Sequence, residues 1–343
     1  MVKLTASFLL VVLLASTSFG QKHHPKVFTS DIDNFWQAYD SIQTTQDSLK
    51  QLYYIQTLYI DKGTEGLTAF MKARDYSAAL WVKLINKLPK FWNSIRPNTV
   101  MVKDKAKEIE KSIEKLKKLY PNLREAQMYF TIGGLRSAGT ITEGKVLVGA
   151  EIATGNATTD VSEFPTKWLE TMFKAQRADN IVPLNIHEYI HTQQIGTPQN
   201  LLGAAIKEGA CDFITELVIG RLMQDSYMQY GRAHESGLKE KFKQDMFTTT
   251  DYSGWLYNGD KTDSVADLGY YMGYAICKSY YNYATNKKQA VKDIVELNYS
   301  NKNGVERFLV LSRYYSASIA SIVNNKITCG EKVLYPNNKN QNC

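Results

Sequence analysis

The segment His187-Glu188-Tyr189-Ile190-His191 constrains the fold of this chain more than any other. On an α-helix, side chains four residues apart leave the same face, so the two imidazoles can bind one tetrahedral metal ion. Glu188 projects beside them, where a carboxylate can take a proton from an activated water and later give it to a leaving amine. The pattern therefore predicts a helix that carries a hydrolytic metal site.

The residues around this segment permit such a helix. Asn180 is suited to cap its N-terminus, Pro183 falls in the first turn, and Gly196 is suited to end it. A buried apolar stripe recurs every fourth residue, at Val182, Ile186 and Ile190. The alternative is an ordinary helix with two histidines one turn apart, and these flanks favour the metal site over it.

A catalytic zinc ion needs a third protein ligand and one open coordination position. Glu208 is the first candidate, because it follows His191 by seventeen positions on a second predicted helix that Asn200 can cap. One turn later on the same face, Asp212 could accept a hydrogen bond from the outer nitrogen of a ligand histidine. The sequence leaves three other groups open as the third ligand: Asp212, Glu216 and His234.

The neighbours of Glu208 favour a buried ligand over an ordinary solvated carboxylate. They are small, and small residues would let this helix approach the HEYIH helix closely. The residues are Gly203, Ala204, Ala205, Gly209 and Ala210.

HEYIH followed by the segment Glu208-Gly209-Ala210-Cys211-Asp212 resembles the gluzincins, zinc peptidases with HExxH on one helix and a ligand glutamate on the next. The resemblance is closest to predicted bacterial zinc proteases related to gliding-motility lipoproteins, and it covers about residues 181 to 220. It implies a bound Zn²⁺ ion and a zincin-like fold. It also implies that Glu188 is the catalytic base, that Asp212 orients a ligand histidine, and that the metal ligands are His187, His191 and Glu208.

Gluzincins commonly use a tyrosine or a histidine to donate a hydrogen bond to the oxyanion that forms during hydrolysis. By this resemblance Tyr271 or Tyr274 is the expected donor, because both lie in a tyrosine-rich helix predicted near the C-terminal end of the chain. His234 is the alternative donor. The ordinary role of these tyrosines would be packing in the core.

Composition changes after Pro121. Residues 126–152 contain β-branched and apolar runs around a Glu143-Gly144 turn, which predicts two or three antiparallel strands. In zincins an edge strand of such a sheet pairs with the extended backbone of the substrate, so Lys145–Gly149 is a candidate peptide-binding strand. The alternative is a hairpin with a purely structural role.

We expect three parts in the chain: a signal peptide at residues 1–20, an N-terminal helical region at 21–122 and a zincin-like metallopeptidase region at 123–343. Apolar residues recur at helical spacing between 30 and 120. A polar connection is expected from about 224 to 263, before a last amphipathic helix. The predicted fold class is α+β and predominantly helical, with a small antiparallel sheet before the HEYIH helix.

Residues 1–20 combine a lysine, a short apolar run and small residues, and no cysteine stands at the expected cleavage site. We therefore expect a secreted or periplasmic protein with no transmembrane segment in the mature chain. Export makes the cysteines candidates for disulfides, and we expect Cys329 to pair with Cys343 and Cys211 with Cys277. The net charge of +7 is spread along the chain and does not indicate nucleic-acid binding.

Together these features predict an exported zinc-dependent peptidase that acts on a peptide or protein substrate. Glu188 would serve as general base towards a zinc-activated water. The sequence indicates no oligomeric state. The first alternative is an envelope binding or assembly protein on a zincin scaffold without proteolytic activity, and the second is zinc-dependent hydrolysis of another kind of substrate.

Overall fold

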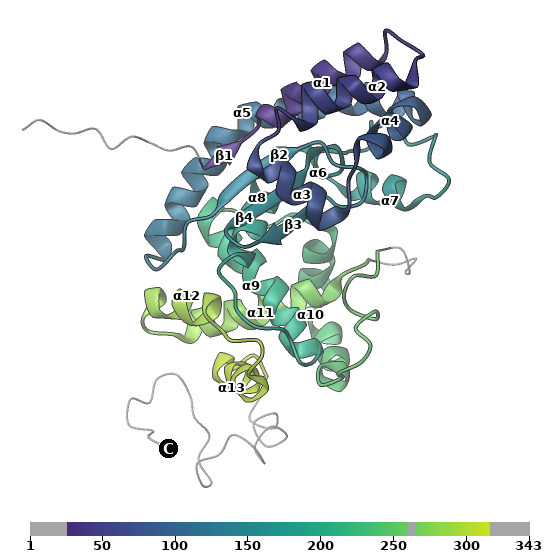
Figure 1. Ribbon diagram of the computed structural model, residues 1–343. Helices are drawn as coiled ribbons and strands as arrows, with labels where there is room; N and C mark the ends of the chain where they lie inside the picture. The colour runs from purple at the N-terminus through teal and green to yellow at the C-terminus, as the bar shows by residue number, and fades with distance from the viewer. Residues whose placement is uncertain (1–25, 260–264, 316–343) are drawn as a thin grey trace, which may run out of the picture.

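The computed structural model describes residues 26–259 and 265–315. Figure 1 shows the N-terminal helices at one end of the molecule, a four-stranded sheet in the middle and the C-terminal helices at the other end. The chain is α+β and predominantly helical, which confirms the predicted fold class. The predicted signal peptide and the predicted Cys329–Cys343 pair lie outside the described residues.

The N-terminal region consists of successive helices, as the periodicity between residues 30 and 120 predicted. Side chains that accept backbone N–H bonds begin three of them, namely Asp47, Thr64 and Ser77. The helices are α1 (Ser30–Ile42), α2 (Ser48–Ile55), the π-helical turn η1 (Gln56–Ile60), α3 (Glu65–Arg74), α4 (Ala78–Lys87) and α5 (Pro89–Leu119).

The sheet contains β1 (Val27–Phe28), β2 (Gln127–Thr131), β3 (Gly139–Thr142) and β4 (Lys145–Gly149), in the order β1-β2-β4-β3. It is mixed, because β2 pairs in parallel with both β1 and β4, whereas β3 and β4 are antiparallel. The prediction of a wholly antiparallel sheet was therefore wrong. The connection at 132–138 carries the chain past β4, so β3 takes the outer edge.

This strand order also corrects the predicted peptide-binding strand. β4 is hydrogen-bonded to β2 on one side and to β3 on the other, so Lys145–Gly149 has no free edge. The edge strand next to it is β3, which is bonded within the sheet on one side only. A peptide that added a strand to this end of the sheet would have to pair with β3.

The remaining helices follow the sheet, and most of the predicted ones are present. They are α6 (Ala150–Ala153), α7 (Trp168–Ala175), the 3₁₀ turn η2 (Ala178–Asn180), α8 (Ile181–His191), α9 (Leu201–Ile219), α10 (Ser226–Asp245), α11 (Leu268–Tyr283), α12 (Lys287–Val295) and α13 (Lys302–Ser312). Helix α10 replaces much of the predicted polar connection. Its buried positions are spread thinly among polar residues, at Met228, Gly231, Leu238 and Phe242, so the sequence shows little helical periodicity there.

Helix α8 packs against α9, but at two of the small positions around Glu208, Gly209 and Ala205, the closest neighbour is α11. A Cβ atom at Gly209 would lie 1.9 Å from the backbone nitrogen of Tyr274, and one at Gly273 would lie 1.8 Å from the carbonyl oxygen of Ala205. The close approach therefore joins α9 to α11, where the prediction placed it between α9 and α8. This contact with α11 fixes the backbone of α9 at Gly209, the residue that follows Glu208.

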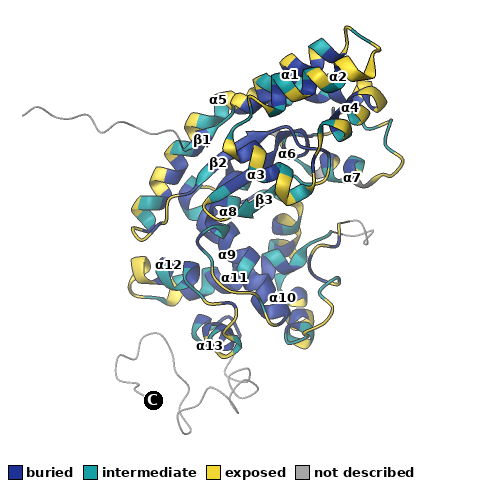
Figure 2. Cartoon of the chain, viewed as in Figure 1, coloured by how far each residue is buried: buried dark blue, intermediate teal, exposed yellow. Residues whose placement is uncertain are grey.

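Burial follows this arrangement. Figure 2 shows the sheet and the central helices largely in dark blue, with exposed residues on the outer helices. Ile186 and Ile190 of α8 are fully buried, and the hydroxyl of Tyr189 both accepts the N–H of Ala126 at 2.9 Å and donates to its carbonyl at 3.2 Å. Helix α8 is thus fixed to the chain that enters β2.

Within residues 26–259 and 265–315, no helix combines the length and the apolar character needed to cross a lipid bilayer.

Candidate metal centre

Helices α8 and α9 bring three potential metal-binding atoms together. The Nε2 atoms of His187 and His191 lie 3.1 Å apart, and Oε2 of Glu208 lies 3.5 Å from the first and 3.1 Å from the second. The residues come from one face of α8 and the facing side of α9. All three side chains are close to fully buried.

These distances fit a tetrahedral zinc ion. Zinc binds imidazole nitrogen and carboxylate oxygen at about 2.0–2.1 Å, so neighbouring ligand atoms in a regular tetrahedron are roughly 3.3 Å apart. The three observed separations, 3.1, 3.1 and 3.5 Å, bracket that value. Three protein ligands leave one corner of the tetrahedron open, which is the arrangement of catalytic zinc sites.

The outer ring nitrogens determine which atoms face the centre. Nδ1 of His187 lies 2.7 Å from Oδ1 of Asp212, and Nδ1 of His191 lies 2.7 Å from Oε1 of Gln194. The Gln194 amide donates through Nε2 to the carbonyl of Lys207, so its oxygen faces His191. Since both acceptors are oxygens, each imidazole donates through Nδ1 and keeps a lone pair on Nε2.

The cluster therefore directs two nitrogen lone pairs and one carboxylate oxygen at the same point, and such a group requires a positive charge. Burial lowers the pKa of His187, but the carboxylates of Asp212 and Glu208 outweigh that effect and raise it well above its usual value. Burial raises the pKa of Glu208, and the bonds with His187 and His191 lower it by more. A proton can bridge only two of the three atoms, whereas a metal cation serves all three.

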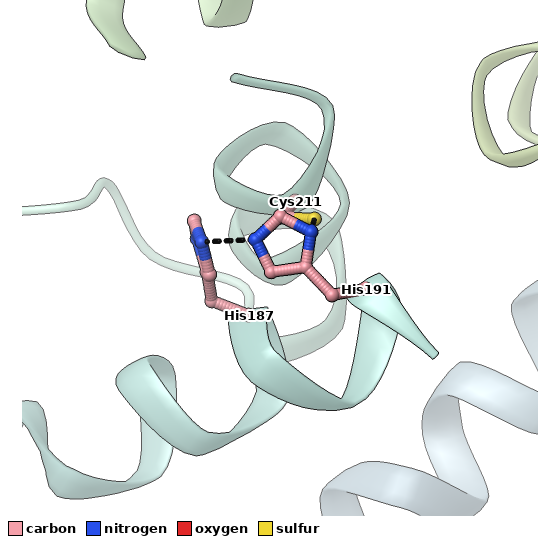
Figure 3. Close-up of side chains that lie close together, drawn as sticks. All are labelled: His187, His191 and Cys211. Atoms are coloured by element: carbon pink, nitrogen blue, oxygen red, sulfur yellow. Dashed lines mark hydrogen bonds between the residues drawn. The ribbon is translucent and has the colours of Figure 1, made fainter. Parts of the chain in front are cut away.

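Cys211 also lies at the cluster, although on its outer side. Its sulfur is within 4.8 Å of both histidines and lies 3.3 Å from Nδ1 of His191. Figure 3 shows the sulfur beside one nitrogen of His191, while the other nitrogen faces His187. An ion held by both Nε2 atoms would meet Glu208 in preference to Cys211. The predicted Cys211–Cys277 disulfide is wrong, because both cysteines are free and the Cys211 sulfur contacts the imidazole.

The side chain of Glu188, on α8, lies against the edge strand β3. An alanine methyl group at position 139 would lie 3.7 Å from Cδ of Glu188, so this carboxylate lies against the first residue of β3. Glu188 is half-buried, and no hydrogen bond or ion pair within the described ranges holds it. Its carboxylate therefore lies beside the edge strand without a bonded partner among the described residues.

A tyrosine from a distant loop completes the surroundings of Glu208. The hydroxyl of Tyr257 donates a 2.8 Å hydrogen bond to Oε1, the carboxylate oxygen that does not face the histidines. Tyr257 has a φ of 54°, in the left-handed region that is rare for a bulky residue. The next residue, Asn258, exchanges backbone-to-side-chain hydrogen bonds of 3.3 and 2.8 Å with Asp267. These bonds fix the backbone directly after Tyr257, whose hydroxyl lies at the candidate metal ligands.

The other residues singled out from the sequence have partners elsewhere. The hydroxyl of Tyr271 donates to Glu235 at 2.8 Å, and that of Tyr274 donates to Glu216, which also receives Lys278 at 3.1 Å. His234 is exposed and its ring stacks on Tyr230 with centroids 4.0 Å apart. The contacts around the cluster therefore involve Tyr257 and not these tyrosines or His234.

Sequence reasoning missed three neighbours of the cluster. Gln194 and Cys211 each follow a candidate ligand by three residues, so helical spacing could have identified them. Tyr257 lies 49 residues beyond Glu208 in an irregular segment, and no local pattern connects the two.

One comparison with known proteins bears on this centre. Residues 156–301 match the model of a family described as predicted Zn-dependent protease (DUF2268). The match includes α8, α9 and the Tyr257 loop, and it begins after the last strand of the sheet. It supports a zinc protease at the coarse level of that description. No curated protein and no solved structure matches the chain.

Proposed function

We propose that this protein is an exported zinc-dependent peptidase of gluzincin type, with zinc bound by His187, His191 and Glu208. The observation that carries the proposal is the triangle of ligand atoms with sides of 3.1, 3.1 and 3.5 Å, whose two imidazoles each donate outward to an oxygen. The family match supports the same class of activity. Export rests on the leader-like pattern of residues 1–20.

Zinc bound at this point would polarise a scissile carbonyl and lower the pKa of a water molecule at the open position. Glu188 accepts the proton of the attacking water and then donates it to the leaving amine. The absence of any hydrogen bond to its carboxylate in the described structure suits a group that must both take and release a proton. Asp212 holds the ring of His187 through its 2.7 Å bond, and its other oxygen is held by Tyr227 at 3.2 Å.

The substrate lies along the outer edge of β3. An extended peptide can pair with the unbonded side of Gly139–Thr142, and Glu188 lies against the first residue of that strand. Because residue 139 is a glycine, no side chain covers the Glu188 carboxylate from this direction. Tyr257 takes the role of the hydroxyl donor near the reacting carbonyl, since its hydroxyl already contacts Glu208.

The test combines metal analysis with activity. We expect about one zinc per chain by mass spectrometry of the purified protein, and hydrolysis of unstructured peptides. Glu188→Gln should keep the zinc and lose activity by roughly 100-fold or more, because the amide cannot accept the proton. A Glu188→Gln variant with full activity would refute the mechanism.

Two carboxylates on the same helix provide a matched control for the third ligand. Glu208→Ala should lose zinc, whereas Glu216→Ala should keep it, because the Glu216 carboxylate is bonded to Tyr274 and Lys278. Wild-type protein that takes up no zinc at neutral pH would contradict the proposal and favour a binding or assembly protein on the same scaffold.

A further inference from the structure

Glu151 is a buried carboxyl group outside the metal centre, and the proposed reaction does not use it. It lies in the first turn of α6, directly after β4, and its side chain has no exposed surface. Its two oxygens accept backbone N–H groups, Oε2 from Gly133 at 2.7 Å and Oε1 from Leu135 at 3.1 Å. No ion pair joins it within the described part of the chain. Burying a carboxyl group without a cation costs free energy. The two hydrogen bonds offset part of that cost, and they fix the backbone that donates them.

The bonds fix the connection between β2 and β3. This connection must pass β4 to reach the edge of the sheet, and Leu135 takes a left-handed φ of 58° on the way. The N-terminal helices hold the same segment from the other side. The indole of Trp81 donates to the carbonyl of Gly133 at 2.9 Å, and Arg136 donates to the carbonyls at the end of α3 at 2.8 and 2.9 Å.

The connection in turn determines the position of β3. This strand is bonded to β4 on one side only, so its two ends and that single ladder fix where it lies. The turn at residues 143–144 joins one end to β4, and the connection held by Glu151 leads into the other end. Gly139, the first residue of β3, lies against Glu188. A displaced connection would therefore move the strand at the point nearest the proposed base.

We propose that Glu151 is a positioning residue that sets the place of the edge strand β3 beside Glu188, through its bonds to the backbone of Gly133 and Leu135. Its meaning for catalysis rests on the proposed function, since only a peptidase would use that edge for substrate. The structural effect on the strand does not depend on any activity.

The charge state of Glu151 provides a second signature. Burial raises the pKa of this carboxyl to about 7, although the backbone N–H bonds partly oppose the rise. An opening of the connection that exposes Glu151 to water would return its pKa to about 4.5, so ionisation favours the opened connection and the segment should loosen as the pH rises through about 7. Burial, and to a smaller extent the charge of Glu151, raises the pKa values of the Tyr59 and Tyr76 phenols. The guanidinium groups of Arg74 and Arg136 oppose this effect at Tyr76. The phenols remain neutral across this pH range, because burial raises their pKa values above the ordinary value.

Hydrogen exchange of the full-length protein tests the proposal. In Glu151→Gln the side chain keeps its shape but presents an NH₂ group to one of the two N–H donors. Exchange of residues 133–142 should then rise about tenfold, while α9 exchanges as in the wild type. In wild-type protein the protection of 133–142, corrected for intrinsic rates, should decrease between pH 6 and 8. The variant should show no such decrease.

The opposite edge of the sheet offers the control. Oε1 of Glu110 also accepts two backbone N–H groups, those of Lys26 at 2.9 Å and Val27 at 3.3 Å, next to β1. Glu110→Gln should loosen residues 26–28 and leave 133–142 unchanged. The proposal is overturned if Glu151→Gln exchanges at 133–142 within twofold of wild type, or if the wild-type segment shows no pH dependence.

Kinetics separate this proposal from the proposed function. If the protein is a peptidase, Glu151→Gln should raise KM for extended peptides about tenfold, with kcat and zinc content close to those of the wild type. A variant with loosened 133–142 but unchanged KM would overturn the link from Glu151 to the substrate edge. A wild-type protein without peptidase activity would defeat the proposed function alone, because hydrogen exchange would still decide the role of Glu151.

Discussion

Replacing Gly209 by alanine should destabilise the protein strongly, although alanine is the better helix former. The new Cβ would lie 1.9 Å from the backbone nitrogen of Tyr274 and 2.2 Å from the carbonyl carbon of Gly273. Ordinary contact begins at 3.4 Å, so the two helices would have to separate by about 1.5 Å, the difference between 3.4 and 1.9. Both contacts are main-chain atoms, so no rotation of a side chain can relieve them.

The expected cost follows from these distances. Overpacking of a well-packed core costs about 1–3 kcal/mol or more, and the backbone clash puts Gly209→Ala at the upper end. The higher helix propensity of alanine over glycine offsets about 1 kcal/mol of this cost. The free energy of unfolding should therefore fall by about 2 kcal/mol in total. With an unfolding entropy of about 2.1 cal/mol/K per residue over 343 residues, that loss lowers the melting temperature by roughly 3 °C.

Gly237 of α10 is the matched control. A Cβ there meets nothing within 4 Å, so Gly237→Ala should gain up to about 1 kcal/mol from helix propensity alone. Urea unfolding of both variants measures the difference, about 3 kcal/mol, and zinc titration should show weaker binding only for Gly209→Ala, which follows Glu208 directly. Equal stability of the two variants would refute the close crossing of α9 and α11 as the cause.

Four further outcomes are expected. Asp212→Asn removes the charged acceptor of the His187 imidazole and should weaken zinc binding about 10- to 100-fold in a competition with a chelator, at unchanged helix content. Tyr257→Phe should lower kcat roughly 100-fold, whereas Tyr271→Phe, which loses an equally short bond to a carboxylate outside the cluster, should not. Removal of zinc by a chelator should lower the free energy of unfolding by about 2.7 kcal/mol relative to protein kept at a zinc concentration of 100 times Kd, as calorimetry can show. Because burial raises the pKa of Glu151 from 4.5 to about 7, its contribution to stability is complete below pH 4.5 and is lost as the pH rises through 7, so the wild type should lose about 3 kcal/mol that Glu151→Gln keeps.

Much of the helical architecture was predictable because its signals are local. The two histidines of α8 share a face through their spacing alone, and Asn200 caps α9 by accepting the N–H of Gly203 at 2.9 Å, as its position before an apolar run indicated. The helices between residues 30 and 120 were equally evident from their apolar periodicity. Helix α10 was missed because only a narrow stripe of its residues is buried. Most of its positions are polar, so its sequence shows little apolar periodicity.

The features that the sequence did not reveal depend on contacts between distant residues. Strand order is one of them, since nothing local to β3 or β4 indicates which strand takes the edge. The partner of Gly209 is another, because a small residue signals a close approach without saying from which side. Tyr257 reaches Glu208 only through the path of an irregular loop. Each of these is a property of the packed chain and not of a short segment.

The sheet precedes the helices that carry the candidate metal ligands in the chain, and this order has a consequence for protein engineering. The family match begins at residue 156, after the whole sheet, so it includes the candidate metal ligands but not the candidate substrate edge. A fragment limited to residues 156–301 would keep α8 and α9 but would lack α5 and β3, against which α8 packs. Under the proposed function, the candidate metal ligands and the candidate substrate edge can therefore be redesigned one at a time, provided that a new partner covers the side of α8 that packs against α5 and β3.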